Sequence, residues 1–188
     1  MIIRQAFRLF LALMLLTGVI YPLGITLAAR IFFPERAGGS IITRRGAPAG
    51  SALLAQKFES PRYFHPRPSA CDFSAIPSGA GNQGPTSRAL KRAILERAAR
   101  LRHDQALPPD APVPPDLLLA SASGLDPHVS PAAVAFQMER VSRARDLTPE
   151  QRARLGKIVQ EFIEPPQFGS LGEPRVNVLL LNLALDDL

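Results

Sequence analysis

The chain of 188 residues contains one cysteine, Cys71, and only three lysines among its 22 basic residues. A single cysteine cannot form a disulfide within the chain, and no Cys/His spacing resembles a zinc site. Arginine supplies the rest of the basic residues, and the net charge is +6. No nucleic-acid-binding motif accompanies this charge, so we expect no nucleic-acid partner.

Motifs of common enzyme classes are also missing. The chain has no Gly-x-Ser-x-Gly nucleophile elbow. A glycine-rich stretch contains Gly79, Gly81 and Gly84, but no lysine follows it and no strand is predicted before it, so it is not a phosphate-binding P-loop.

Ser123, Asp126 and His128 crowd one short segment and raise the question of a hydrolase. The members of a catalytic triad normally come from separated elements that aim them at one point, so we predict no catalytic residues here. We expect Asp126 and Ser130 to shape a turn and cap a helix. A membrane-anchored hydrolase that uses this segment is the alternative. Asp126 and His128 lack a third ligand at a suitable spacing, so no metal site is predicted.

From Leu9 to Ala29 the chain carries no charged residue. A helix over this stretch would be about 31 Å long, which matches the hydrocarbon core of a bilayer. The stretch is longer than the roughly 7 to 15 apolar residues of a signal peptide. We therefore predict a retained single-pass transmembrane helix over residues 9–29, with a cleaved signal peptide as the alternative.

Small residues and a proline interrupt this predicted span. Pro22 has no N–H to bond back to residue 18, so a kink or local distortion is expected there. Gly24 and Ala28 lie four residues apart on one helix face, and with Gly18 they offer small surfaces that another membrane helix could approach closely. Glycine and proline are also common in membrane helices that have no such partner. The basic residues on both sides leave the orientation open.

The remaining residues indicate one tethered domain. Residues 1–8 form a short N-terminal tail, residues 30–50 an exit linker, and residues 51–188 one soluble domain. Residues 60–85 are rich in Pro, Gly, Ser and Asn and are predicted to form a long loop.

A helix is predicted from Thr86, because apolar residues recur there at three- and four-residue steps: Leu90, Ile94, Ala98 and Leu101. Its other face is basic and carries Arg88, Lys91, Arg92, Arg97, Arg100 and Arg102. A solvated helix face is the simpler interpretation, and a binding module for anionic lipid surfaces is the alternative.

The C-terminal half alternates predicted strands and helices. Residues 117–120 read as a short buried strand and residues 176–185 as a central strand. Ser130-Pro131 begins a helix that runs to Ala144, and the capping box at Thr148–Gln151 begins the next one. We therefore predict an α+β fold: one N-terminal transmembrane helix, followed by a small soluble domain of helices packed on a small sheet.

Several segments match the pattern of one known family in order and spacing. They are Leu16–Leu23, Gly50–Leu54 with Gln56 and Phe58, Tyr63–Ala70, Ser78-Gly79, Asn82, Gly84–Thr86, Ser121–Pro131, Gly172–Val178 and Leu181–Asp186. Together they cover nearly the whole chain, which resembles the C subunit of the Kdp-type potassium-transporting P-type ATPase. The chain departs from the family pattern at Ala80, Gly81, Gln83 and Ser87, and at Leu180, where a glutamate is typical.

The resemblance implies a non-catalytic subunit of a potassium uptake complex in the bacterial inner membrane. Its partners would be a channel-like potassium-translocating subunit, an ATP-hydrolysing P-type subunit, a small hydrophobic subunit and membrane lipid. The chain would stabilise the complex and act as a catalytic chaperone that raises the ATP affinity of the hydrolysing subunit. It would bind no cofactor tightly and meet ATP only through a transient complex with that subunit.

The resemblance also implies which residues meet the partners, and it places the soluble domain on the extracytoplasmic side. Gly18, Pro22, Gly24 and Ala28 would pack the span into the complex. The candidate contacts in the loops are Tyr63, Phe64, His65, Arg67, Asn82, Gly84, Pro85, Thr86, Ser123, Gly124, Asp126 and His128.

Overall fold

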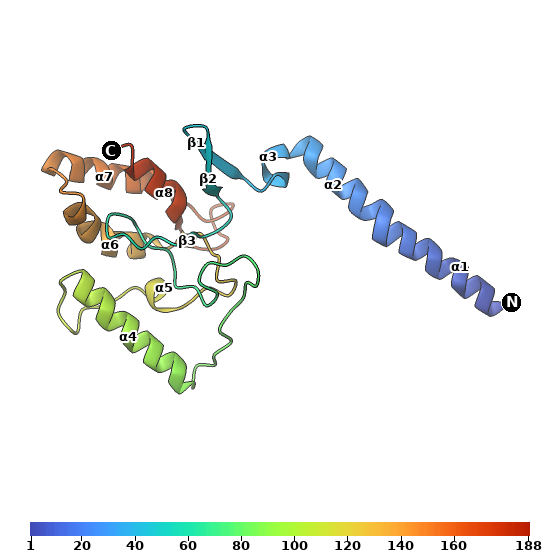
Figure 1. The fold of residues 1–188 in the computed structure, drawn as a ribbon, viewed down its shortest axis with the longest axis horizontal. Helices are drawn as coiled ribbons and strands as arrows, with labels where there is room; N and C mark the ends of the chain where they lie inside the picture. Colours follow the sequence, from blue (N-terminus) through green and yellow to red (C-terminus); the bar gives the residue numbers. More distant parts are fainter. The chain divides into compact units, whose positions relative to one another are not determined.

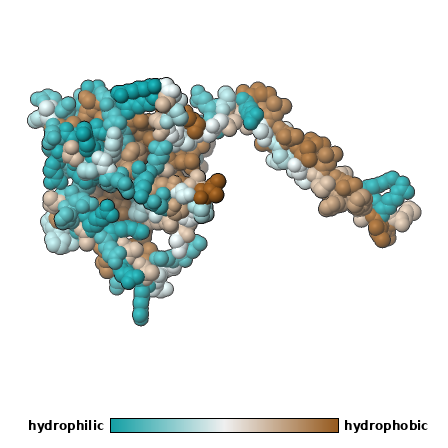
Figure 2. All heavy atoms as spheres, in the orientation of Figure 1, coloured by the Kyte–Doolittle hydropathy of each residue, from teal (hydrophilic) through white to brown (hydrophobic).

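The computed structural model describes residues 1–188 and divides into two compact units, Met1–Ser51 and Ala52–Leu188. The first unit begins with one long helix made of α1 (Ile2–Leu15), a π-helical turn η1 (Leu16–Ile20) and α2 (Tyr21–Phe32). None of these residues is buried, and most of those visible in Figure 2 are hydrophobic. The helix Ile2–Phe32 is long and apolar enough to cross a membrane, and it extends beyond the predicted span at both ends.

The π-helical turn lies directly before Pro22. Pro22 cannot donate the backbone hydrogen bond toward residue 18. The helix therefore adopts the wider π-helical geometry for one turn before Pro22. The predicted local distortion is thereby confirmed. Thr17 and Thr26 bond their hydroxyls back to the carbonyls of Leu13 and Pro22, which satisfies their polar groups within the helix.

The segment after the long helix is more ordered than the exit linker that we predicted. It contains a short helix α3 (Pro34–Ala37) and an antiparallel hairpin of β1 (Ile41–Arg44) and β2 (Ala47–Ser51). Arg45 and Gly46 join the strands with φ of 51° and 80°. A two-residue hairpin turn whose twist matches that of the flanking strands requires positive φ at both central residues. An Arg-Gly pair predicts such a turn less strongly than Asn-Gly does.

The second unit is an α+β domain, as predicted. Its elements are α4 (Arg88–Asp104), α5 (Pro115–Leu118), β3 (His128–Val129), α6 (Pro131–Ala144), α7 (Pro149–Glu161), β4 (Ile163–Glu164), β5 (Arg175–Asn177) and α8 (Val178–Leu185). The three strands form an antiparallel sheet in the order β3-β5-β4. Figure 1 shows α6, α7 and α8 grouped together and α4 apart from them, beside α5.

One hydrophobic core joins the sheet, α6, α7 and α8 to the long loop. Its fully buried side chains include Phe64 from the loop, Val134 and Val141 from α6, Leu155 from α7 and Leu181 from α8. No helix or strand lies between Ser51 and Arg88, so the prediction of a long loop over residues 60–85 is confirmed.

The helices α6 and α7 begin where their caps predict. Ser130 accepts a hydrogen bond from the Ala133 amide, and Thr148 and Gln151 form the reciprocal capping box. α4 begins at Arg88, two residues after Thr86, because Ser87 is the residue whose side chain caps it.

Both predicted strands of the C-terminal half were wrong. Of residues 117–120, Leu117 and Leu118 end the short helix α5, which starts with Pro115 at a helix-favouring first position, and the other two lie in no strand. Of residues 176–185, only Val176 and Asn177 are in a strand, and α8 begins at Val178 because the Asn177 side chain caps it by accepting from the Leu180 amide. A continuous apolar run has no period that separates a strand from a buried helix.

Candidate functional site

Side chains from two helices fasten the irregular segment of residues 61–65 to the core. The Asn182 amide of α8 accepts from the Phe64 N–H at 2.8 Å and donates to the Phe64 carbonyl at 2.9 Å. The Gln137 amide of α6 makes the same pair of bonds with the His65 backbone, at 2.8 and 3.1 Å. Each amide thus replaces the neighbouring strand that this segment lacks.

Arg140 of α6 completes the fastening. Its guanidinium donates to the Pro61 carbonyl at 2.6 Å, the Tyr63 carbonyl at 3.0 Å and the Gln137 side-chain oxygen at 2.8 Å. Burial lowers the pKa of Arg140 to about 10. Burial also lowers the pKa of His65, and the positive charge of Arg140 acts in the same direction.

A cluster at the end of α8 holds the same segment from the other side. Arg145 donates to the Arg62 carbonyl at 2.7 Å and pairs with Asp186 at 2.7 Å. The Tyr63 hydroxyl donates to Asp186 at 3.2 Å, and the Arg145 guanidinium lies 4.9 Å from the centre of the Tyr63 ring. The residues Tyr63, Phe64 and His65, which we predicted as partner contacts, are thus engaged within the chain, and Phe64 has no exposed surface.

Arg67 and the charged side chains of the Ser121–Pro131 loop and the sheet lie next to one another in a row, which we call the charged row. Arg67 pairs with Asp126 at 3.2 Å, and the His128 ring lies 3.5 Å from Asp126 and 4.0 Å from Glu164. Glu164 in turn pairs with Arg175 at 2.9 Å. The pKa of Asp126 is held below its usual value, chiefly by the hydrogen bond with the His128 side chain.

This loop is shaped by its own side chains, as the sequence predicted. Asp126 accepts from the His128 amide at 3.0 Å, and Ser123 accepts from the Leu125 amide at 3.1 Å. The Ser123 hydroxyl has no contact with His128 in the structure, so the residues of the alternative hydrolase are not assembled into a triad.

Gly124 lies where this loop meets the 69–79 segment. A Cβ atom at residue 124 would come within 2.5 Å of the Cys71 sulfur and 3.1 Å of the Ser69 hydroxyl, and the φ of Gly124 is +72°. Only glycine fits both the close approach and the left-handed backbone. Gly124 is buried, and its role is therefore to let the two loops touch.

The remaining predicted contact residues are exposed. Asn82, Gly84, Pro85 and Thr86 lie in the segment that leads to α4, and Asn82 has a φ of +47°. The Gly84 carbonyl accepts from the Ser87 amide at 2.9 Å, which places Ser87 for its capping role.

The predicted packing residues of the long helix are open to a partner. An ideal Cβ on Gly18 or Gly24 would meet no atom within 4 Å, and Pro22 is exposed. Gly18 lies within the π-helical turn, while Gly24 and Ala28 both lie in α2.

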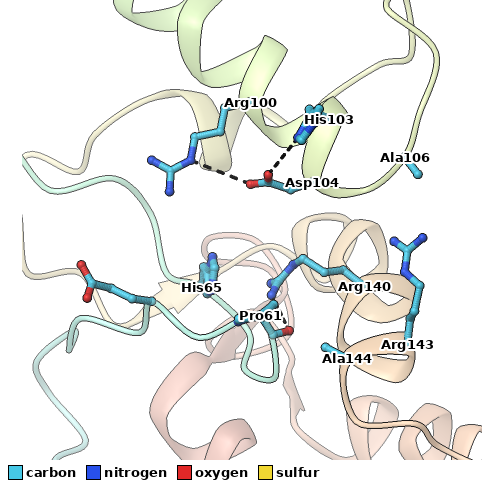
Figure 3. Close-up of a pocket in the computed structure, with 10 residues that line it drawn as sticks. Pro61, His65, Arg100, His103, Asp104, Ala106, Arg140, Arg143 and Ala144 are labelled. Atoms are coloured by element: carbon cyan, nitrogen blue, oxygen red, sulfur yellow. Dashed lines mark hydrogen bonds and ion pairs between the residues drawn. The ribbon is translucent and has the colours of Figure 1, made fainter.

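Two cavities of the second unit are lined in part by residues described above. The larger, of about 480 Å³, lies between the C-terminal part of α4 and the 59–65 segment with α6 (Figure 3). Arg100, His103 and Asp104 line one side, and His65 and Arg140 line the other. The smaller, of about 310 Å³, lies over the charged row. The residues that line it include Arg67, Asp116, Asp126, His128 and Arg175.

Neither cavity contains an arrangement typical of catalysis or of a metal site. In the larger cavity Asp104 lies near Arg100 and His103, at 3.8 and 3.5 Å. In the smaller cavity Asp126 lies near Arg67 and His128, at 3.2 and 3.5 Å. No group of three or more His, Cys, Asp or Glu residues could hold a metal ion.

Sequence reasoning missed the residues that fasten the 61–65 segment: Gln137, Arg140, Arg145 and Asn182. Gln137 and Arg140 lie on the buried face of α6 between Val134 and Val141, and Asn182 interrupts an apolar run. A polar residue at a core position needs a hydrogen-bond partner. The polar residues within these apolar patterns could therefore have been predicted to hold another segment by hydrogen bonds.

Two of the six residues of the predicted basic face of α4 are also engaged. Arg97 donates to the Leu118 carbonyl at 2.7 Å and Arg102 to the Ala111 carbonyl at 2.8 Å. These bonds fasten α4 to the 111–118 segment. Arg88, Lys91, Arg92 and Arg100 remain exposed.

Comparisons with known proteins agree over nearly the whole chain. Residues 3–187 match the family model described as KdpC, the c chain of K⁺-transporting ATPase. The potassium-transporting ATPase KdpC subunit of Cereibacter sphaeroides is 48% identical over 184 residues, which covers 98% of this chain and 96% of that protein. The corresponding subunit of Rhodospirillum rubrum is 50% identical over 189 residues, covering 98% and 95%. The chain therefore belongs to the KdpC family, the c chains of K⁺-transporting ATPases.

Proposed function

We propose that this chain is a non-catalytic subunit that stabilises an ATP-driven potassium uptake complex of the bacterial inner membrane. Family membership carries the proposal, since the curated relatives are named as subunits of a potassium-transporting ATPase. The partners would be a channel-like potassium-translocating subunit, an ATP-hydrolysing subunit and a small hydrophobic subunit.

The design of the chain supports a structural role. Its conspicuous polar side chains bond to its own backbone, as Asn182, Gln137 and Arg140 do, and Ser123 is not paired with His128. The surface open to other molecules includes the apolar helix Ile2–Phe32, the exposed basic residues of α4 and the exposed loops of the second unit.

We further propose that the second unit lies outside the cytoplasm and that the chain raises the ATP affinity of the hydrolysing subunit. A domain on that side of the membrane cannot touch a nucleotide inside the cell. Its influence on ATP binding would therefore be a coupling free energy transmitted through the membrane helices.

Packing of the helix tests the assembly role. Gly24→Leu places a large side chain on the face of Gly24 and Ala28, and we expect it to lower the recovery of intact complex after detergent extraction by several-fold. Ala29→Leu lies about 140° around α2 from Gly24 in a helix of 3.6 residues per turn, so it is the matched control and should leave recovery unchanged. Equal recovery with Gly24→Leu and wild type would contradict close packing at this face.

The single cysteine tests the orientation. Cys71 is partly exposed in the second unit, so an impermeant thiol reagent should label it in cells whose outer membrane has been made permeable. A Cys71→Ser chain is the negative control, and lysed cells show that the thiol is reactive. Labelling only after lysis would place the second unit in the cytoplasm and contradict the proposed orientation.

A further inference from the structure

The loop between β4 and β5 presents a large apolar side chain to solvent. Phe168 is 92% exposed and Leu171 is 60% exposed. Residues 165–172, Pro-Pro-Gln-Phe-Gly-Ser-Leu-Gly, carry no charge. We call these residues the Phe168 tip. Exposed apolar surface that charged groups do not interrupt is typical of interaction sites.

The Phe168 tip is held in shape by its own backbone. The Gln167 amide donates to the Leu171 carbonyl at 2.9 Å, and the Leu171 amide donates back to Gln167 at the same distance. Phe168 has a φ of +53° and Gly169 a φ of +78°. A bulky residue rarely occupies this left-handed region, which Asn or Gly would fill at lower steric cost. The exposed phenylalanine is therefore presented by a defined turn.

The base of the tip is attached to the core. β4 pairs with β5 in an antiparallel register, and Glu164 forms an ion pair with Arg175 across the two strands at 2.9 Å. Val176, one residue further, is fully buried. The strands at its base therefore hold the Phe168 tip in a fixed position on the domain.

The charges around the tip decide what kind of surface fits it. Residues 161–175 contain three glutamates and one arginine, a net charge of −2 in a chain whose total is +6. An anionic lipid surface would repel this segment. A protein socket with apolar walls and a basic rim would attract it, because the rim would complement the glutamates while the walls cover the phenylalanine.

We propose that the Phe168 tip docks into an apolar socket with a basic rim on a neighbouring subunit of the potassium-transporting complex. This inference rests on the proposed function, since it requires the chain to belong to that complex. It goes further by assigning one contact surface, in a segment apart from the predicted contact residues.

Photo-crosslinking in the assembled complex tests the proposal. The photoreactive residue p-benzoylphenylalanine replaces Phe168 in the tagged full chain, and the complex is irradiated in native membranes. The matched control carries the same group at Ile76, another apolar residue of the second unit that is 90% exposed. We expect an adduct with another subunit from residue 168 and at least five-fold less from residue 76.

Other occupants would give other products. An adduct with lipid only, with a second copy of this chain, or with no molecule would overturn the proposal. Equal yields of one subunit adduct from residues 168 and 76 would overturn it too, because the contact would not be specific to the tip.

Two substitutions give a second measurement with the same control position. Phe168→Ser should lower recovery of the complex at high detergent concentration several-fold. Adding Glu173→Lys to Phe168→Ser should lower this recovery further, and Ile76→Ser should leave it unchanged. Unchanged recovery with Phe168→Ser and with the double variant would contradict docking of the Phe168 tip into a socket on another subunit. Failure of the tagged wild-type chain to co-purify with any other subunit would instead refute the proposed function, so the two failures are distinguishable.

Discussion

Gln137 and Arg140 show how single polar residues can organise a loop in this domain. Both are buried on α6, and both direct their polar atoms at backbone groups of residues 61–65. Removing either side chain would leave buried carbonyl or amide groups without partners, which costs about 1–3 kcal/mol for each group. The segment is therefore positioned by side-chain bonds where a sheet would use a neighbouring strand.

His65 links this arrangement to pH. Its pKa is lowered in the folded chain, chiefly by burial, so the unfolded chain binds a proton at a higher pH than the folded chain does. The contribution of His65 to stability is complete above its unfolded pKa of about 6.5 and is lost as the pH falls through the folded pKa. We expect the full chain in detergent to lose unfolding free energy as the pH falls below about 6.5.

The substitution His65→Gln should make this loss smaller, because glutamine does not titrate. Urea unfolding of the full chain at several pH values measures it. His103→Gln is the control, since the side chain of His103 is 91% exposed. Identical pH slopes for wild type and His65→Gln would show that His65 does not contribute.

At the scale of elements, caps and periodic helices could be predicted from the sequence. Ser130 and the Thr148–Gln151 box mark the starts of α6 and α7, and α4 follows its apolar repeat. These signals are local: each needs only the side chain and the backbone within one turn.

The sheet and α8 could not be predicted in the same way. The strands β3 and β4 have two residues each, which is too short for an alternating pattern. Apart from Asn177 and Asn182 the run Val176–Leu185 is apolar, and only the cap at Asn177 and the surrounding core decide that α8 is helical. Likewise, Tyr63, Phe64 and His65 of the predicted contact residues are fixed by residues 72 to 123 positions away, a separation that no local pattern reports.

The fastening of residues 61–65 to α8 predicts a large effect of Asn182→Ala. The change removes both bonds to the Phe64 backbone and buries an N–H and a C=O without partners, so we expect a loss of at least about 2 kcal/mol in unfolding free energy. Urea unfolding of the full chain in detergent is the measurement.

Gln160→Ala removes an exposed amide from α7 and serves as the control, with an expected change within about 0.5 kcal/mol. A loss for Asn182→Ala no greater than for this control would mean that the Asn182 bonds do not hold the segment.

At the scale of the whole molecule, the chain pairs an apolar helix with a domain whose buried polar residues Gln137, Arg140 and Asn182 are engaged internally. Such a chain offers surfaces for assembly, namely the small-residue face at Gly24 and Ala28 and the Phe168 tip. We infer that its contribution to ATP-driven potassium transport is made through contacts with other subunits.

Recovery of the complex from cells that do or do not make this chain tests the assembly role most directly. The other subunits are expressed with one tagged member, membranes are extracted in mild detergent, and the complex is quantified together with its potassium-stimulated ATP hydrolysis. We predict that recovery and hydrolysis fall at least several-fold without the chain and return when the wild-type chain is supplied. Equal recovery and equal hydrolysis at low ATP with and without the chain would contradict the proposed function.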